Sequence, residues 1–245
     1  MTQYKRILIK LSGGAVAGSG ESGFDPKAIE HIVGEVLSVV DRGFQVAIVI
    51  GGGNIFRGNV SKTWGIERAE ADNIGMLGTV INSLMLRGAL KAKSAKEVRV
   101  MSAIPMEAIA EPYIRLRAIH HLEKGYVVIF SGGIDQPYVT TDYPAVQRTL
   151  ETHCEAILVA KQGVSGVFTA DPKLDPHAKM YETLSYDDFL REKIKIMDQS
   201  ALLLARDFSL PVHIFNFTLP GAIRKICMGE HIGTYIGPKT VMKTV

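Results

Sequence analysis

Short apolar segments alternate with longer amphipathic ones along this chain, and this alternation limits its fold more than any other feature of the sequence. Short apolar runs bounded by turn residues are typical of buried strands, whereas apolar residues at helical spacing are typical of helices that cover a sheet. Strands and helices in alternation favour parallel pairing, because each helix carries the chain back to the start of the next strand. We therefore expect an α/β protein, a three-layer αβα sandwich with a mainly parallel central sheet.

The pattern assigns strands to 4–11, 45–50, 98–102, 126–130, 156–160 and 212–215. It assigns helices to 25–41, 73–93, 112–124, 142–152, 198–207 and 221–228. Asp25 followed by Pro26 predicts a helix start, since a carboxylate suits the N-cap and proline suits the first helical position. The glycine-rich segment 163–171 is expected to form a turn or a hairpin.

The 245 residues contain no linker, repeat or low-complexity tract, so we expect a single domain over 1–245. Hydrophobic residues make up 47% of the chain and charged residues 22%, which is the balance of a soluble globular protein. The amino terminus leads into only a short apolar run, and no stretch approaches the roughly 18 apolar residues of a membrane span. We expect a soluble, unsecreted, cytoplasmic protein.

The formal net charge is +3, and like charges form no block of five or six. This pattern argues against a nucleic-acid partner and against a polybasic membrane patch. Cys154 and Cys227 are the only cysteines, in no metal-like spacing, which excludes a disulfide framework and fits a reducing compartment. We assign no metal ligands from the sequence.

Familiar catalytic motifs are absent: the sequence has no G-x-x-x-x-G-K-[ST], no G-x-S-x-G and no H-E-x-x-H. The run from Gly18 to Gly23 matches G-x-G-x-x-G, but it begins seven residues after the expected strand end at Leu11 and is followed by a new helix start. A dinucleotide fingerprint requires strand, glycines and helix in immediate succession, so we reject that interpretation. A surface loop is the simpler account.

Ligands in parallel α/β sheets bind beyond the carboxyl ends of the strands. The loops after Leu11, Ile50, Phe130 and Ala160 are therefore where we expect a site. In the first of them, Lys10 ends a strand that runs into a glycine turn. Backbone N–H groups in such a turn can hold phosphate oxygens, and a lysine adds a point charge that suits a transferring phosphoryl group. The alternative is a solvated lysine before an ordinary turn.

Three consecutive glycines, Gly51 to Gly53, follow the second expected strand, and Arg57 stands four residues beyond them. Glycines in a row carry a high conformational-entropy cost, which is tolerable where the backbone must come within contact distance of a ligand. Arginine matches phosphate with a planar fork of donors. We therefore favour a phosphate-binding loop over a purely structural turn.

The segment 131–142 places glycines, an amide, hydroxyls and carboxylates between an expected strand and an expected helix. Thr140 or Thr141 could cap that helix, a role compatible with phosphate or base contacts at the same terminus. Asp142 could orient Lys10, help to hold Mg²⁺, or act only as a member of a capping box. Asp72, just before the helix expected at 73–93, has an ordinary interpretation as an N-cap.

Small residues, Phe168 and an Asp-Pro turn at Asp171 follow the expected strand 156–160. Phe168 could stack on a nucleotide base. Taken in isolation, the segment favours a phenylalanine in the core and an ordinary turn.

Taken in this order, the segments resemble those of the amino-acid kinase superfamily. Within that superfamily they resemble the uridylate kinase family in particular. The likeness is carried by 5–13, 49–58, 101–105, 166–172 and 197–198, and it extends from Tyr4 to Ile236. It implies a kinase that transfers the γ-phosphoryl group of ATP to UMP, giving UDP and ADP, in pyrimidine nucleotide biosynthesis. Its fold would be amino-acid kinase-like.

The resemblance also implies roles for individual residues. The catalytic residues would be Lys10, Arg57, Asp142 and Asp198. ATP would be bound by Lys10, Leu11, Ser12, Gly13, Gly53, Arg57, Lys161, Gln162, Phe168 and Asp171. UMP would be bound by Gly52, Asp72, Ile134, Asp135, Gln136, Pro137, Tyr138, Val139, Thr140 and Thr141.

Further implications of the resemblance concern cofactor and regulation. It implies Mg²⁺ with ATP, a homohexamer and feedback inhibition by UTP. Activation by GTP would act through Ser19, Gly20, Glu21, Ser22, Gly23 and Phe24.

Such a reaction is an in-line attack by a phosphate oxygen, which is already ionised near neutral pH, so catalysis would rest on positioning and charge neutralisation. One rival is a kinase of the same fold that acts on a carboxylate or carbamate, which the residues after Gly53 and the segment 131–142 would discriminate. Another is a nucleotide-binding regulatory or storage protein that has lost transfer. Retention of Lys10 and Arg57, with the two aspartates at 142 and 198, argues against the second rival.

Overall fold

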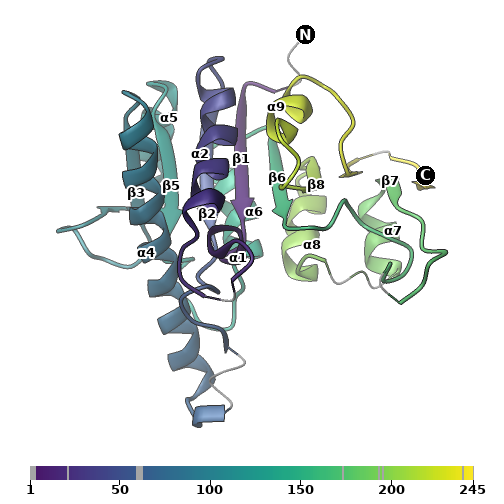
Figure 1. The fold of residues 1–245 in the computed structure, drawn as a ribbon, viewed down its shortest axis with the longest axis horizontal. Coiled ribbons are helices and arrows are strands. Elements are labelled where there is room, and N and C mark those ends of the chain that lie inside the picture. The colour runs from purple at the N-terminus through teal and green to yellow at the C-terminus, as the bar shows by residue number, and fades with distance from the viewer. Residues whose placement is uncertain are drawn as a thin grey trace.

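The computed structural model describes residues 4–20, 22–58, 63–172, 174–192, 194, 196–238 and 240–244. Strands and helices alternate through most of the chain (Figure 1). The strands are β1 (Arg6–Leu11), β2 (Gln45–Ile50), β3 (Val98–Ser102), β4 (Glu111–Pro112), β5 (Val127–Ser131), β6 (Ala156–Lys161), β7 (Tyr181–Leu184), β8 (Val212–Asn216), β9 (Thr234–Ile236) and β10 (Lys243–Thr244). The helices are α1 (Gly14–Ala17), α2 (Pro26–Val40), α4 (Arg68–Lys93), α5 (Arg115–Glu123), α6 (Asp142–Glu151), α7 (Tyr186–Arg191), α8 (Gln199–Asp207) and α9 (Ala222–Cys227).

Within the described residues the strands form one ten-stranded sheet in the order β10-β7-β9-β8-β6-β1-β2-β5-β3-β4. Pairing is parallel except where β9 meets β8 and where β10 meets β7. The expectation of a mainly parallel sheet is therefore confirmed. None of the helices in the described ranges is long and apolar enough to cross a bilayer.

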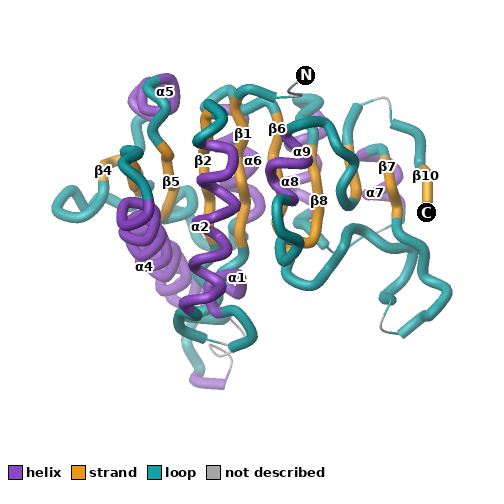
Figure 2. The backbone as a smooth tube through the Cα atoms, turned by 45° about the horizontal axis from the view of Figure 1, so that its top comes forward, coloured by secondary structure: helices purple, strands orange, loops and turns teal. Residues whose placement is uncertain are grey.

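Helices cover both faces of the sheet, as Figure 2 shows. The core on one side contains side chains from α1, α2, α4 and α9, and the core on the other side contains side chains from α5, α6, α7 and α8. The three-layer αβα expectation is confirmed. Because both faces of the central strands are covered, these strands are nearly continuous apolar runs rather than alternating ones.

β1 shows how this burial prepares a site. Ile7, Ile9 and Leu11 point into the α2 side of the sheet, whereas Leu8 points into the α6 side. Successive side chains of a strand point to opposite faces, so Lys10 shares the α6 side with Leu8. A charged residue is thereby placed at the end of a buried strand, beneath a helix.

The structure corrects several expected boundaries. α4 begins at Arg68, five residues before the expected start at Asn73, with Glu67 at its N-cap position. Its first turns extend beyond the edge of the sheet (Figure 1), so they lack the apolar periodicity that marks a packed helix. Asp72 consequently lies inside the helix, and its interpretation as an N-cap is wrong.

The sequence pattern did not predict several short helices and strands. α1, β4, β7, α7, β9 and β10 contain six residues or fewer, which is too short for a periodic pattern to emerge. Segment 163–171 does not form a hairpin within itself. Instead Phe168 makes an isolated antiparallel bridge with Met180, just before β7. The expected helix start is confirmed: the Asp25 carboxylate accepts from the N–H groups of Lys27 and Ala28.

His213, on β8, is a buried histidine in a largely aromatic environment. Its Nε2 lies 2.8 Å from the Tyr4 hydroxyl oxygen, and its ring packs against Tyr4 and Tyr235. Burial lowers the pKa of His213 to about 4, and the neighbouring charge of His231 acts in the same direction. The imidazole is therefore neutral in the folded protein at pH 7.

We expect the free energy of unfolding to fall as the pH drops from 6.5 to 4. Over that interval the unfolded chain binds a proton on this histidine and the folded chain does not, so acid favours unfolding. The shift corresponds to a loss on the order of 3 kcal/mol. Urea unfolding at several pH values should show this loss in the wild type and a smaller one in His213→Gln. Equal acid losses in both proteins would contradict the assignment.

Candidate active site

The loops that the sequence singled out converge at one edge of the sheet. Strands β6, β1, β2 and β5 are neighbours in that order, and all four run parallel. Their carboxyl ends therefore meet at the same edge. After β1 the chain forms β2 on one side of it, whereas the later strand β6 pairs with the other side of β1, so the order of the strands reverses at this point. This reversal makes the crevice in which open α/β sheets bind ligands, and the sequence did not reveal it.

Lys10 and Asp142 form a buried ion pair at this edge. The Lys10 Nζ lies 2.5 Å from the Asp142 Oδ1, and the two side chains are 10% and 12% exposed. Burial by itself would raise the pKa of Asp142, but the charge and hydrogen bond of Lys10 outweigh it, and the pKa lies below its ordinary value. The carboxylate is thus ionised and orients Lys10, one of the roles expected for it.

A second carboxylate joins this pair. The other oxygen of Asp142 accepts a hydrogen bond from the Asp198 backbone N–H at 3.1 Å. The Asp198 carboxylate in turn accepts from the Thr140 hydroxyl. Three of the four residues predicted to be catalytic, Lys10, Asp142 and Asp198, are therefore connected, and Thr140, predicted to contact UMP, joins them. The fourth, Arg57, is not part of these contacts.

Lys161, the last residue of β6, adds a second ammonium group. Its Nζ donates to the Ile196 carbonyl oxygen at 2.5 Å. Burial lowers the pKa of Lys161 and the positive charge of Lys10 lowers it further, while Asp142 and Asp198 oppose the shift. These opposing influences place Lys161 in the same electrostatic cluster as the two aspartates.

The glycine turn after β1 packs directly against the triglycine loop, Gly51 to Gly53. A Cβ added to Gly13 would lie 2.5 Å from the Gly53 nitrogen and 2.8 Å from the Asn54 nitrogen, so only glycine fits there. Within the described residues, the backbone N–H groups of Gly13, Gly52, Gly53 and Asn54 donate no hydrogen bond. A cluster of free N–H groups is an anion-binding concavity.

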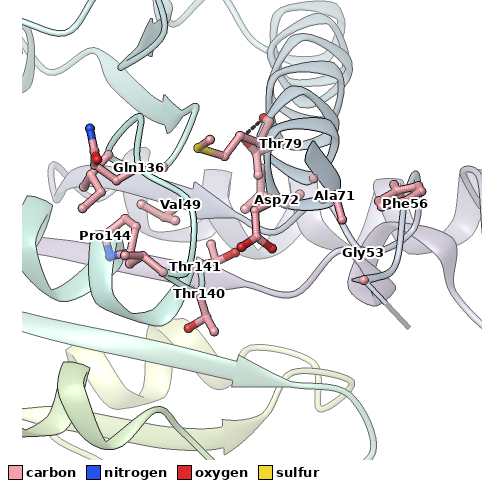
Figure 3. Close-up of a pocket in the computed structure, with 18 of the residues that line it drawn as sticks. Val49, Gly53, Phe56, Ala71, Asp72, Thr79, Gln136, Thr140, Thr141 and Pro144 are labelled. Carbon is pink, nitrogen blue, oxygen red and sulfur yellow. Dashed lines mark hydrogen bonds between the residues drawn. The ribbon is translucent and has the colours of Figure 1, made fainter. Parts of the chain in front are cut away.

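A cavity of about 210 Å³ lies between α4 and the segment 130–148, and we call it the α4 cavity. Figure 3 shows the Asp72 carboxylate pointing into it, with Gly53 and Phe56 on one side and Gln136 on the other. Residues predicted for UMP that line it are Gly52, Asp72, Ile134, Gln136, Val139, Thr140 and Thr141. Three others, Asp135, Pro137 and Tyr138, are not among its described lining residues.

Asp72 connects α4 to the segment 131–142, which leads into α6. Its carboxylate accepts a hydrogen bond from the Tyr138 backbone N–H at 2.7 Å and pairs with Arg68 one helical turn earlier. The loop is strained, because Asp135 and Tyr138 have φ values of 57° and 67°. Left-handed non-glycine residues persist where the surroundings hold them, and they concentrate at functional sites.

A larger cavity, of about 790 Å³, is lined by 163–172 together with Glu192, Ile194 and Ile196, and we call it the 163–172 cavity. Phe168 is half-buried and lines it, so this phenylalanine is available to a ligand rather than enclosed in the core. Asp171 is exposed at the same cavity. The charged cluster reaches both cavities, because Thr140 lines the first and Ile196, whose carbonyl oxygen accepts from Lys161, lines the second.

The remaining predicted ATP residues lie around this cluster. The Leu11 side chain is fully buried, so only its backbone faces the loops. Ser12 adjoins Gly13 in the turn, and Gln162 donates to the Gly18 carbonyl oxygen at 2.6 Å. Arg57 is exposed and donates from Nε to the Gly53 carbonyl oxygen at 3.1 Å.

The loop predicted to respond to GTP folds back onto the site. Gly20 donates to the Ala17 carbonyl oxygen, and Gly23 donates to that of Asn54 at 3.1 Å. Phe24 is 40% exposed. Glu21 lies outside the described residues.

Sequence reasoning missed one face of α4. Gly52 approaches the helix so closely that a Cβ on it would lie 2.3 Å from the Gly75 carbonyl oxygen. The Thr79 hydroxyl accepts from the Gly132 N–H at 2.8 Å. On α4, the four positions Gly75, Gly78, Thr79 and Asn82 have the spacing of one helix face. Their small or polar side chains within an amphipathic helix are the signal that could have revealed this face.

Arg148 was missed as well. This buried residue of α6 lines the α4 cavity, pairs with Glu151 at 2.6 Å and stacks on the Tyr113 ring. Its burial depends on those tertiary partners, which no local pattern identifies.

Comparisons with known proteins agree with this geometry. Residues 5–216 match the amino acid kinase family. A uridylate kinase of Frankia casuarinae is 57% identical over 236 residues, covering 96% of this chain and 91% of that protein. A crystal structure of UMP kinase from Bacillus anthracis superposes with a TM-score of 0.96 at 62% identity, covering 98% of this chain and 99% of the other. UMP kinase from Ureaplasma parvum gives 0.90 at 33% identity, covering 96% and 100%.

The fold and the charged strand edge thus define a kinase built on the amino acid kinase architecture. The chain belongs to the amino acid kinase family and, within it, to the uridylate kinases.

The buried pair of Lys10 and Asp142 makes a prediction about stability. Removing one partner of a buried ion pair typically costs about 3–5 kcal/mol, whereas replacing both with apolar groups is often neutral. We expect Asp142→Leu to be strongly destabilised in urea unfolding and the double variant Lys10→Met, Asp142→Leu to regain most of the loss while remaining inactive. A double variant no more stable than the single one would contradict this.

Proposed function

We propose that this protein transfers the γ-phosphoryl group of ATP to UMP, giving UDP and ADP, as a step of pyrimidine nucleotide biosynthesis. The observation that carries the proposal is the buried ion pair of Lys10 and Asp142 at the edge of the sheet, in a cluster that reaches both cavities through Thr140 and Ile196. The relatives named uridylate kinase and UMP kinase support UMP as the acceptor.

The chemistry of the α4 cavity suits UMP. The Asp72 carboxylate offers acceptors to the ribose hydroxyls, and the Gly52 N–H, which donates no hydrogen bond within the described residues, suits the phosphate. The uracil would lie toward Gln136 and Thr141, with Ile134, Val139 and Thr140 as further contacts. Asp135, Pro137 and Tyr138 would act by shaping the loop.

The chemistry of the 163–172 cavity suits the adenosine of ATP. Phe168 offers a ring face for stacking, and Asp171 offers a polar contact in its lining. Gln162 directly precedes the first lining residue, Gly163, and would add a further polar contact. The triphosphate would run past Lys161 toward Lys10, Ser12 and Gly13. Leu11, Gly53 and Arg57 complete the predicted ATP contacts.

In this arrangement, Lys10 stabilises the charge on the transferring phosphoryl group. Asp142 holds the ammonium in place and Asp198 braces Asp142 through its backbone N–H. Arg57 lies four residues beyond the triglycine loop and donates to its Gly53 carbonyl oxygen, so its guanidinium would contact the same phosphates. The attacking oxygen of UMP is ionised near neutral pH, so positioning and charge neutralisation suffice and no side chain acts as general base.

Mg²⁺ would accompany ATP and neutralise charge on its phosphates. Among the described residues, no group of three or more His, Cys, Asp or Glu side chains could hold a metal by itself. That arrangement fits Mg²⁺, which is usually bound through substrate phosphates and only one or two carboxylates. Asp142 and Asp198 are the carboxylates at the strand edge that would hold the ion.

We also propose that the protein is a cytoplasmic homohexamer. We propose further that GTP activates it through Ser19 to Phe24 and that UTP inhibits it. These proposals rest on the likeness to the uridylate kinase family. Support for self-association comes from α4. Ile74, Leu77 and Ile81 of that helix are 36%, 47% and 45% exposed, and exposed apolar patches mark interaction surfaces.

Turnover of the four nucleoside monophosphates tests the function. We expect UMP to be preferred over CMP, AMP and GMP, because a mismatched exocyclic group would leave polar atoms unpaired in the α4 cavity. An ADP-release assay with each acceptor measures this, and Lys10→Met, expected to lose on the order of 10²–10³-fold in kcat, controls for contaminating kinases. Equal turnover of CMP would refute the preference. Phosphorylation of a carboxylate or carbamate instead of UMP would favour the rival kinase of the same fold. Nucleotide binding without phosphoryl transfer would favour the regulatory or storage protein.

Asp72 gives a sharper prediction about the α4 cavity. If its carboxylate accepts from the ribose hydroxyls, Asp72→Ala should lose roughly 1.5–3 kcal/mol of UMP binding, about ten- to a hundredfold in affinity. Titration of UMP and deoxyuridine monophosphate into both proteins separates contact from loop positioning. We expect the wild type to favour UMP and the variant to bind the two ligands alike. A variant that loses affinity for both ligands equally would show that Asp72 acts only by positioning the segment around Tyr138.

A further inference from the structure

Asn54 and Asn82 are buried polar residues that the mechanism above does not use, with 2% and 0% of their surfaces exposed. Their carboxamides face each other across the junction of the triglycine loop and α4. Asn82 Nδ2 donates to Asn54 Oδ1 at 2.6 Å, and Asn54 Nδ2 donates to Asn82 Oδ1 at 3.1 Å. A buried amide is costly without partners, so the other contacts of the pair show what it holds.

The second N–H of each amide donates to a backbone carbonyl oxygen. Asn82 donates to Gly51 at 2.7 Å, and Asn54 donates to Gly23 at 2.9 Å. Carbonyl oxygens only accept, so each side chain must present its nitrogen to them, and the orientation of both amides is fixed. Both N–H groups of both amides are thus in use.

This pairing determines which way the triglycine loop faces. The Gly51 carbonyl is held toward α4, and the Gly51 N–H donates to the Leu11 carbonyl oxygen at 3.0 Å. The C=O and N–H of a trans peptide point in opposite directions, so the Gly52 N–H points away from Asn82. The turn is closed by Ile55 and Phe56, whose N–H groups both donate to the Gly52 carbonyl oxygen. Donors fixed before the ligand arrives are the most effective at stabilising developing charge.

The same pair reaches the Gly18 to Phe24 loop. Asn54 and Gly23 exchange two hydrogen bonds, one from the Asn54 side chain and one from the Gly23 N–H to the Asn54 carbonyl oxygen. Gly23 has a φ of 75°, a conformation that side chains rarely adopt. Moving this loop would break both bonds and leave the buried Asn54 amide without one of its partners.

We propose that the carboxamide pair of Asn54 and Asn82 positions the triglycine loop for phosphate binding and couples it to the Gly18 to Phe24 loop. The inference rests on the proposed phosphoryl transfer at this site. Both asparagines are positioning residues: they act on the substrates through the N–H groups of the loop. The pair would therefore affect turnover more than it affects the overall stability of the fold.

Asn82→Ala is the direct test, with Ser83→Ala as its matched control. Ser83 is equally buried on the same helix, and its hydroxyl donates to the Thr79 carbonyl oxygen at 2.7 Å, so its loss removes one buried hydrogen bond and no loop contact. We expect Asn82→Ala to lower kcat by on the order of 10- to 100-fold, with a smaller change in KM for UMP. Ser83→Ala should lower Tm and leave kcat near the wild-type value.

A kcat for Asn82→Ala equal to that of Ser83→Ala, at comparable Tm, would overturn the positioning role. If Asn82→Ala does not fold, Asn54→Ala removes the same pair from the loop side and carries the same expectation. Amide hydrogen exchange at Gly52 with and without UMP, and at Gly53 with and without ATP, gives a readout independent of turnover. Each ligand should protect its amide in the wild type and fail to do so in the variant. A wild type that binds ATP with protection but does not phosphorylate UMP would refute the proposed function and leave this inference standing.

The coupling is tested by a double-mutant cycle of Gly23→Ala and Asn54→Ala. In the wild-type background Gly23→Ala forces an alanine into a left-handed conformation and should lower kcat. If the loops communicate through Asn54, the same substitution should have little further effect in the Asn54→Ala background. Effects that multiply independently would overturn the coupling.

Discussion

A lysine at the end of a buried parallel strand must meet a carboxylate, and the layout of this site follows from that requirement. Lys10 is only 8% exposed, and the partner that neutralises it is Asp142, the first residue of α6. The start of α6 is thereby fixed over the carboxyl end of β1. The same carboxylate accepts from the Asp198 N–H, which fixes the start of α8 as well. One ion pair thus fixes the starts of two helices at the site.

Helix α4 supplies the second constraint. Its inward face holds the triglycine loop by the close approach of Gly52 to Gly75 and by the Asn82 amide, and it holds the Gly132 turn through Thr79. Loops from two neighbouring strands are therefore fixed to one rigid element rather than to each other. Because the outward face of the same helix exposes apolar side chains, contacts made there by another copy would bear directly on the element that shapes the site.

The sequence was sufficient for the layers, the central strands and the loops that carry the chemistry, because each of these leaves a local pattern. Lys10, Gly51 to Gly53 and Asp142 could be singled out by their positions after apolar runs. What failed depends on tertiary structure. The first turns of α4 project past the sheet, so no apolar stripe marks them, and the local pattern therefore allowed an N-cap at Asp72, which lies inside the helix. Asn82 and Arg148 are buried polar residues whose partners are distant in the chain, at Gly51 and Tyr113 respectively.

Several features that oppose folding gather at the edge of the sheet that carries the site, although others, such as the left-handed residues His153 and Ser209, lie elsewhere. A buried ion pair, left-handed residues at Asp135 and Tyr138, and N–H groups at Gly52 and Gly53 that have no hydrogen-bond partner in the described part of the chain all oppose folding. Elsewhere the central strands are apolar and buried on both faces, and they supply the stabilisation that tolerates these features. The N–H groups have to remain open until phosphate arrives, because a loop that satisfied them internally would have to break its own bonds to bind. Holding the loop from behind, through carbonyl groups rather than N–H groups, resolves this conflict, and the Gly51 carbonyl bound by Asn82 is the point at which the chain does so.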